Sequence, residues 1–206
     1  MSAPVVTFAA LAERVLVSEP RCGGTRLVCV DGPSGSGKTV LAERLAAALP
    51  DPVVVHMDDL YPGWDGLAAA VPELFERIIA PLLAGHAAGY RRYDWERGGY
   101  AEEHDIGTPA VLLVEGVGSA ARIIAAHAVL VAWLEAPRAE RFRRGIERDG
   151  EGYRPHWERW ARQEDVHFAA ERTRERAGLH VDGAPSQPHE PAAEMVLLRE
   201  PAPAAG

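Results

Sequence analysis

The sequence predicts a three-layer α/β fold in which helices cover both faces of a mostly parallel sheet. Short apolar runs alternate with segments of helical periodicity along most of the chain. Two of these runs, 110–114 and 129–134, are continuously apolar, which is typical of strands buried on both faces. A glycine-rich segment, 32–37, joins a third run to a helix. In such a fold, ligands bind at the carboxyl ends of the strands.

The first quarter of the chain predicts a helix followed by a strand–loop–helix unit. Apolar residues recur at helical spacing before Pro20 and a glycine pair, so residues 1–24 are expected to form a short amphipathic helix and a linker beside the core. Residues 26–30 then predict a strand and residues 38–49 a helix with leucines on one face. A second buried strand is expected at 53–56.

The rest of the chain continues the alternation of helices and strands. A long helical stripe runs from Leu67 to Leu83, and Pro81 should kink its end. Residues 85–107 are rich in glycine and aromatic residues and predict a loop. After the two apolar strands the pattern predicts a helix at 137–148, a glycine-containing break at 150–155 and a second helix at 156–176. A last short strand is expected at 179–181.

One domain is expected over 1–183, followed by a tail at 184–206 that is rich in proline and alanine and mostly irregular. The 206 residues and 47% hydrophobic content suffice for a substantial core. A formal net charge of −8 argues against nucleic acid or an anionic membrane as a partner, because either would require a concentrated basic face.

The cellular setting is inferred from cysteine usage and apolar runs. Cys22 and Cys29 match no zinc or redox spacing and are expected to be free thiols. Neither a signal core nor a run of membrane-spanning length is visible in the sequence, so a cytoplasmic location is expected. The pattern leaves the oligomeric state open, a homo-oligomer included.

The glycine-rich segment carries the strongest chemical signal. Its sequence fits the pattern Gly-x-x-x-x-Gly-Lys-Thr between a strand and a helix, which is the context of a phosphate-binding loop, or P-loop. The preceding strand favours this interpretation over a plain glycine-rich turn. The fold class is therefore that of a P-loop NTPase, with ATP and Mg²⁺ as the expected cofactors. The residues expected to contact the nucleotide here are Gly32, Ser34, Gly35, Ser36, Gly37, Lys38, Thr39 and Val40, with Lys38 reaching the terminal phosphates and Thr39 as a magnesium ligand.

Two carboxylates follow predicted strands at the same edge of the sheet. Asp58 comes after the second strand, where it could orient an acceptor hydroxyl or take its proton; capping a turn is the alternative. Glu115 ends the strand at 111–114, where a magnesium role in the manner of a Walker B acid is natural; the alternative is a solvated strand-end carboxylate.

The helix at 137–148 is dense in arginine. Arg141, Arg144 and Arg148 are spaced three and four apart, so they share one face and could neutralise charge on a transferring phosphoryl group. A solvated helix with internal ion pairs is the alternative. Arg143 points away from that face and is expected to be structural.

Aromatic residues gather in two places. Tyr90, Tyr93, Trp95 and Tyr100 could stack a planar substrate or pack a loop over the sheet, and the pattern does not separate these interpretations. Trp157, Trp160 and Phe168 lie at helical spacing and are expected in the core. The eight histidines show no metal-ligand spacing.

From Arg26 to Gly183 the sequence resembles the uridine kinase and uridine–cytidine kinase group, within the set that includes phosphoribulokinase and pantothenate kinase. Residues 56–61 resemble that family's Asp-x-Phe-Tyr element, which implies a catalytic base at Asp58 and a substrate-bordering Tyr61. Trp64-Asp65 and Tyr93-Asp94-Trp95 resemble its Phe-Asp and Tyr-Asp-Phe elements, which implies acceptor contacts for Asp65 and Tyr93. Val114-Glu115-Gly116 and the run 141–149 match its Glu-Gly and arginine-rich lid elements, so residues 137–155 are expected to form a lid.

The resemblance implies phosphoryl transfer from ATP to a small-molecule hydroxyl, most naturally the 5′-hydroxyl of a pyrimidine nucleoside. Lys38, Asp58 and Arg144 would be catalytic, Thr39 and Glu115 would hold Mg²⁺, and Arg141, Arg144 and Arg148 would contact the nucleotide, Arg148 also the acceptor.

Departures from the family pattern concern the acceptor. The segment between Tyr61 and Trp64 is shorter than in nucleoside kinases, and Gly98-Gly99 replaces a base-contacting histidine. A kinase for a sugar, nucleotide or vitamin-like acid remains an alternative, as does a nucleotide-binding regulatory switch. The acceptor elements and the arginine helix favour an enzyme over a switch.

Overall fold

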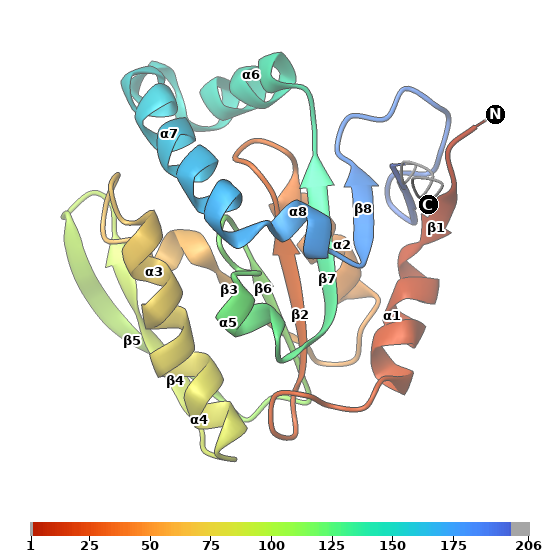
Figure 1. Ribbon diagram of the computed structural model, residues 1–206, viewed down its shortest axis with the longest axis vertical. Coiled ribbons are helices and arrows are strands. Elements are labelled where there is room, and N and C mark those ends of the chain that lie inside the picture. Colours follow the sequence, from red (N-terminus) through yellow and green to blue (C-terminus); the bar gives the residue numbers. More distant parts are fainter. Residues whose placement is uncertain (1, 199–206) are drawn as a thin grey trace.

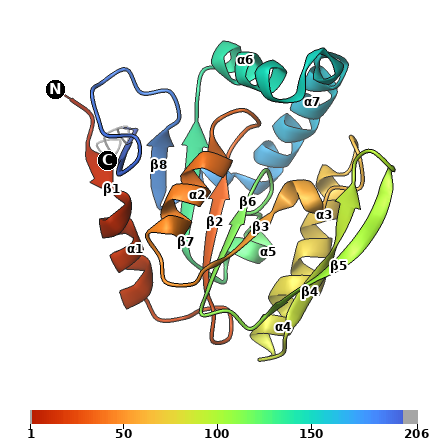
Figure 2. The same ribbon diagram turned by 180° about the vertical axis from the view of Figure 1, so that it is seen from behind.

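The computed structural model describes residues 2–198, and residues 199–206 of the expected tail lie outside the described part. Five parallel strands form the central sheet in the order β3-β6-β2-β7-β8. They span Val53–His56, Val111–Glu115, Arg26–Asp31, Ala128–Glu135 and Leu179–Asp182 respectively. The predicted fold class is confirmed, since helices lie on both faces of this sheet (Figures 1 and 2).

One face of the sheet is covered by α1 (Phe8–Val17) and α2 (Lys38–Ala47); Figure 2 shows α2 in front of the strands and α1 to its left. Their apolar side chains, Leu11 and Leu45 among them, are almost fully buried against Val28 and Val30 of β2. The helix expected within residues 1–24 therefore packs beside the core. A short ribbon of β1 (Val5–Thr7) and β9 (Glu194–Val196) brings the two ends of the described chain together.

The other face carries the longer helices. Helix α3 (Leu67–Leu74) continues through a π-helical turn (Phe75–Ile79) into α4 (Ala80–Leu83), so the predicted stripe is one unbroken helical run. The short α5 (Arg122–Ala125) and the long α7 (Arg154–Glu171) complete this layer. Helix α7 ends where Arg172 adopts a left-handed conformation (φ 52°), and α8 (Thr173–Arg176) follows, which divides the helix predicted at 156–176.

The loop predicted over 85–107 is wrong: this segment is an antiparallel hairpin of β4 (Ala88–Asp94) and β5 (Gly99–Gly107). Its four-residue turn is closed by the bond from Gly98 N to Asp94 O (2.8 Å). The hairpin lies at the edge of the molecule beside α3 and α4 (Figure 1). Because no residue of β5 is buried and the run 102–105 is entirely polar, its sequence lacks the apolar signal of a strand.

The lid segment lies over the carboxyl ends of the strands. Helix α6 (Arg138–Asp149) follows β7 directly, and a 3₁₀ turn (Glu151–Tyr153) leads into α7 (Figure 1). A second 3₁₀ turn (Met57–Asp59) follows β3 at the same edge. No helix within residues 2–198 is both long and apolar enough to cross a bilayer.

Candidate active site

The P-loop connects β2 to α2 and opens the site. Gly37 precedes α2 with φ 103°, so the first amides of the helix point out of its N-terminus, where they favour an anion. Lys38 is almost fully buried, and its Nζ donates to Pro33 O of the same loop (3.1 Å). Ser36 Oγ is buried without a hydrogen-bond partner among the described residues. A helix N-terminus beside a buried, orphaned hydroxyl fits a bound phosphate group.

Glu115 lies beside the P-loop because β6 pairs with β2 in a register that sets Glu115 opposite Val30. Thr39 Oγ1 donates to Glu115 Oε1 (3.0 Å), and His56 Nδ1 lies 2.7 Å from the same oxygen. Burial would raise the pKa of Glu115, but His56, Lys38 and Thr39 outweigh it and hold the pKa below its usual value. The hydrogen bond to Glu115 raises the pKa of His56.

The donor set at this point fits magnesium. A hydroxyl and an ionised carboxylate are the hard oxygen ligands that Mg²⁺ takes, and it fills its remaining positions with water and phosphate oxygens. Thr39 and Glu115 present these two oxygens within hydrogen-bonding distance of each other. Among residues 2–198 no cluster of three or more His, Cys, Asp or Glu side chains forms a metal site of its own.

Asp58 sits one strand further along the same edge. It lies in the 3₁₀ turn after β3, whose last residue, His56, is opposite Glu115 in the sheet. The side chain of Asp58 is accessible from the cavity, but the surrounding cavity walls keep much of the bulk solvent away from it. The resulting desolvation, followed by repulsion from Glu115, raises the pKa of Asp58, while Arg148 and Lys38 act against the rise.

A single cavity of about 1050 Å³ joins these groups. Most of the residues predicted from sequence line it: Ser34, Gly35, Gly37, Lys38, Thr39, Val40, Asp58, Tyr61, Glu115, Arg144 and Arg148. Helix α6 closes the donor side, and the aromatic side chains of Trp64, Trp95, Tyr153 and Trp160 form much of the wall beyond Asp58. The cavity therefore has a phosphate-binding half and an aromatic half, with Asp58 between them.

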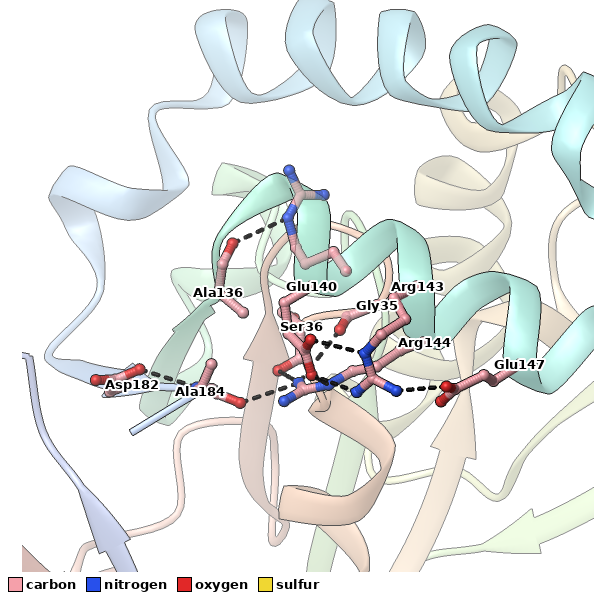
Figure 3. Close-up of polar contacts among 11 residues, drawn as sticks. Gly35, Ser36, Ala136, Glu140, Arg143, Arg144, Glu147, Asp182 and Ala184 are labelled. Atoms are coloured by element: carbon pink, nitrogen blue, oxygen red, sulfur yellow. Dashed lines mark hydrogen bonds and ion pairs between the residues drawn. The ribbon is translucent and has the colours of Figure 1, made fainter. Parts of the chain in front are cut away.

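The lid arginines have different partners. Arg144 donates from Nη1 to Gly183 O (3.0 Å) and more weakly to Ser36 O (3.4 Å), and its Nε pairs with Glu140 (Figure 3). Arg141 is turned into the protein, where it donates to Ser34 O (3.2 Å) and Ala136 O (3.1 Å). Helix α6 is thus fastened to the carbonyl side of the P-loop.

The outer arginines of α6 are paired with neighbouring acids. Arg143 pairs with Glu140 and Glu147 on the outer face of α6 (Figure 3). Its predicted structural role is consistent with this position. Arg148 pairs with Asp149 at the end of the helix and still lines the cavity.

Five predicted site residues do not line the cavity: Gly32, Ser36, Arg141, Asp65 and Tyr93. Tyr93 packs edge-on against Trp95 (ring centroids 5.5 Å apart) and Tyr100 (5.7 Å). Asp65 is exposed and forms an ion pair with Arg159 of α7. These two acceptor assignments therefore stay predictions.

Two buried acids shape the site although the sequence pattern did not predict them. Asp31 is completely buried at the end of β2 and accepts hydrogen bonds from the amides of Gly32 (2.7 Å), Gly118 (3.1 Å) and Ala120 (3.0 Å). An acid directly before the first glycine of the loop is the clue that could have pointed to it. Glu164 is buried in α7 and accepts from Ser34 N (2.7 Å); its helical position gives no such clue.

Trp160 has two roles. It is almost fully buried and packs edge-on against Tyr61 at 4.8 Å, as expected for a core residue, and it also lines the cavity.

No protein-family model matches the chain. Uridine-cytidine kinase C of Dictyostelium discoideum is 26% identical over 105 residues, which cover 46% of this chain and 23% of that protein. A structure described as a possible uridine kinase from Bacillus stearothermophilus has a TM-score of 0.62 at 22% identity, covering 84% of this chain and 96% of the other. A second, described provisionally as a fructose transport system kinase from Silicibacter sp. TM1040, has a TM-score of 0.56 at 28% identity, covering 84% and 95%. Matches at this level support the fold and leave the acceptor open.

Proposed function

We propose that this chain, which groups with the uridine kinase-like P-loop kinases, transfers the γ-phosphoryl group of ATP to a hydroxyl of a small molecule. The 5′-hydroxyl of a pyrimidine nucleoside is the first candidate acceptor. The observation that carries the proposal is the single cavity in which the P-loop, Glu115 and Asp58 meet. A nucleotide switch would need the first two groups but not a carboxylate facing a second, aromatic compartment.

On the donor side, the P-loop amides and Lys38 would bind the β- and γ-phosphates. Thr39 and Glu115 would hold Mg²⁺, which supplies charge neutralisation to the phosphate oxygens when bound. The lowered pKa of Glu115 keeps its carboxylate ionised at neutral pH, as a metal ligand requires. Arg144 and Arg148, which line the cavity from the lid, would counter the charge that develops during transfer.

On the acceptor side, Asp58 would orient the attacking hydroxyl and take its proton. A general base is most effective when its pKa approaches the working pH, and the pKa of Asp58 is displaced in that direction by desolvation and by Glu115. The lid helix and the aromatic wall would exclude water, so that the phosphoryl group passes to the acceptor rather than to water.

The test incubates the protein with Mg-ATP and a panel of nucleosides, nucleotides, sugars and hydroxy acids, and measures ADP release with and without each compound. Stimulation by uridine or cytidine would support the first candidate, and stimulation by another compound would replace the acceptor while keeping the reaction. ADP release that no acceptor stimulates would refute the kinase assignment in favour of a switch.

Asp58→Asn tests the assigned base with the acceptor that the panel identifies. The variant should bind ATP normally and lose about 10²- to 10⁴-fold in phosphoryl transfer, because the amide cannot accept the proton. Near-normal turnover would remove Asp58 from that role. ATP binding by the variant, measured by titration calorimetry, controls for loss of the fold.

A further inference from the structure

Residues 62–66 form a short strap between Tyr61 and α3. Within it Trp64 lines the aromatic half of the cavity, whereas Asp65 is on the outside with 68% of its side chain exposed. The strap thus contributes to the cavity wall through Trp64. The contacts that fix the position of Trp64 therefore determine the shape of the aromatic half of the cavity.

One face of α7 grips the strap through three side chains. His156 stacks on the Trp64 ring with centroids 4.1 Å apart and an interplanar angle of 2°. Arg159 donates from Nε to Asp65 Oδ1 (2.6 Å) and from Nη2 to the second carboxylate oxygen. Gln163 Nε2 donates to the Trp64 main-chain oxygen (2.6 Å). These helix positions are three and four residues apart, so the three side chains lie on one face.

Further contacts connect the strap to Asp58, the residue assigned as the base. The ring of Trp95, in the turn of the β4–β5 hairpin, packs edge-on against Trp64 with centroids 4.9 Å apart. Trp95 Nε1 donates to the main-chain oxygen of Asp58 (2.9 Å). A continuous series of contacts therefore runs from Arg159 on α7 through the strap and the hairpin to the residue assigned as the base.

We propose that Asp65 does not contact the acceptor but forms a latch with Arg159, which positions Trp64 against the acceptor. Arg159 and Asp65 are then positioning residues. Each carboxylate oxygen of Asp65 accepts a hydrogen bond from the guanidinium, and the side chain is outside the cavity lining. The inference rests on the proposed function only for its kinetic consequence; the latch itself is a property of the fold.

The latch has a consequence for the class of acceptor. A carboxylate free to read the vicinal diol of a ribose would reject an acceptor that lacks one of the hydroxyls, because its own hydrogen bonds would be lost. Asp65, engaged outside the cavity, cannot supply this discrimination. A 2′-deoxynucleoside should therefore be phosphorylated with a kcat/KM within about threefold of that of the corresponding ribonucleoside.

The experiment compares Arg159→Gln, Asp65→Asn and the charge-swapped pair Asp65→Arg/Arg159→Asp. Each single variant should raise the KM of the acceptor identified by the panel about tenfold, because a misplaced binding wall weakens acceptor positioning, and should leave the KM of ATP unchanged. The swapped pair should return the acceptor KM to within about threefold of wild type. Arg162→Gln is the matched control, since Arg162 is exposed on the same helix without a hydrogen bond or ion pair among the described residues.

Direct contact between Asp65 and the acceptor gives the opposite pattern. Asp65→Asn would then impair acceptor use, Arg159→Gln would leave it intact or improved, and the swapped pair would stay impaired because arginine accepts no hydrogen bond from a hydroxyl. That pattern would overturn the latch. A strong preference of the wild type for the ribonucleoside over the 2′-deoxynucleoside would also overturn it, if Asp65→Asn abolished that preference.

A readout without acceptor separates this inference from the proposed function. Near-UV circular dichroism reports the packing of Trp64 against His156 and Trp95. Arg159→Gln should reduce this signal, the swapped pair should restore it, and Arg162→Gln should not change it. If no acceptor stimulates the wild type, the proposed function fails while this spectral series still decides the latch. Equal spectra for all variants would refute it.

Discussion

Replacing Gly35 by alanine tests how closely the lid helix rests on the P-loop. Gly35 has φ +77°, and a β-carbon there would lie 2.3 Å from the main-chain oxygen of Arg141 and 2.8 Å from its Cα. Both are backbone atoms of α6, so no flexible side chain can move aside. The left-handed conformation costs an alanine about 1–2 kcal/mol. The overlap adds about 1–3 kcal/mol, as for other overpacked sites.

Gly85→Ala is the matched control because it separates these two contributions. Gly85 has φ +74°, almost the same φ as Gly35, but no heavy atom lies within 4 Å of the position that a β-carbon would take there. It should lose only the conformational part, so Gly35→Ala should be less stable than Gly85→Ala by about 1–3 kcal/mol.

Urea denaturation followed by circular dichroism measures both variants against wild type. For a chain of this size each kcal/mol also lowers Tm by roughly 2–4 °C, which gives a second measurement. Equal losses for the two variants would show that α6 can lift from the loop without cost. The reasoning that fastens the lid to the P-loop through backbone contact would then be refuted.

Two further predictions concern buried titratable groups. Burial raises the pKa of Asp31 from an ordinary 3.8 to about 6, so the native state binds more protons than the unfolded state between about pH 4 and 6 and stability falls as pH rises through that window. Asp31→Asn removes this titrating group, so the stability of wild type relative to this variant should fall by roughly 2 kcal/mol from pH 4 to 7 in urea titrations. A pH-independent difference would contradict the assignment. Burial also raises the pKa of Cys22 to about 11 and that of Cys29 further, so neither thiol should react with Ellman's reagent in the native protein at pH 8. Two equivalents should react when the protein is unfolded in guanidinium. Rapid labelling of the native protein would contradict the burial of these thiols.

Local patterns were sufficient for most of the fold. Continuous apolar runs predicted β6 and β7 because strands covered on both faces contain few polar residues. The glycine pattern after β2 predicted the P-loop because the conformation of the loop depends mainly on the residues within it. The hairpin of β4 and β5 escaped prediction because only Ala88 and Tyr90 of β4 are buried in the core and no residue of β5 is, so its sequence carries little core-facing pattern.

The donor half of the site was also predictable, for a topological reason. Lys38, Thr39 and Glu115 follow or end predicted strands, and the carboxyl ends of parallel strands meet at one edge. Asp58 was placed by the same rule. Each of these positions depends on the strand next to it and requires no knowledge of distant segments.

The acceptor half depended on the tertiary structure. Asp65 and Arg159 are 94 positions apart, and Asp58 and Trp95 are 37 apart, so no local period relates them. The family resemblance implied an acceptor contact for Asp65, and only the packing of α7 across the strap revealed another partner for it. By itself the sequence determined the sheet, the phosphate loop and the acids at its edge, because strand burial and loop glycines act locally. Which side chains face the cavity and which face a neighbouring helix was decided by the packing of distant segments, because side-chain direction depends on contacts that form only when the chain has folded.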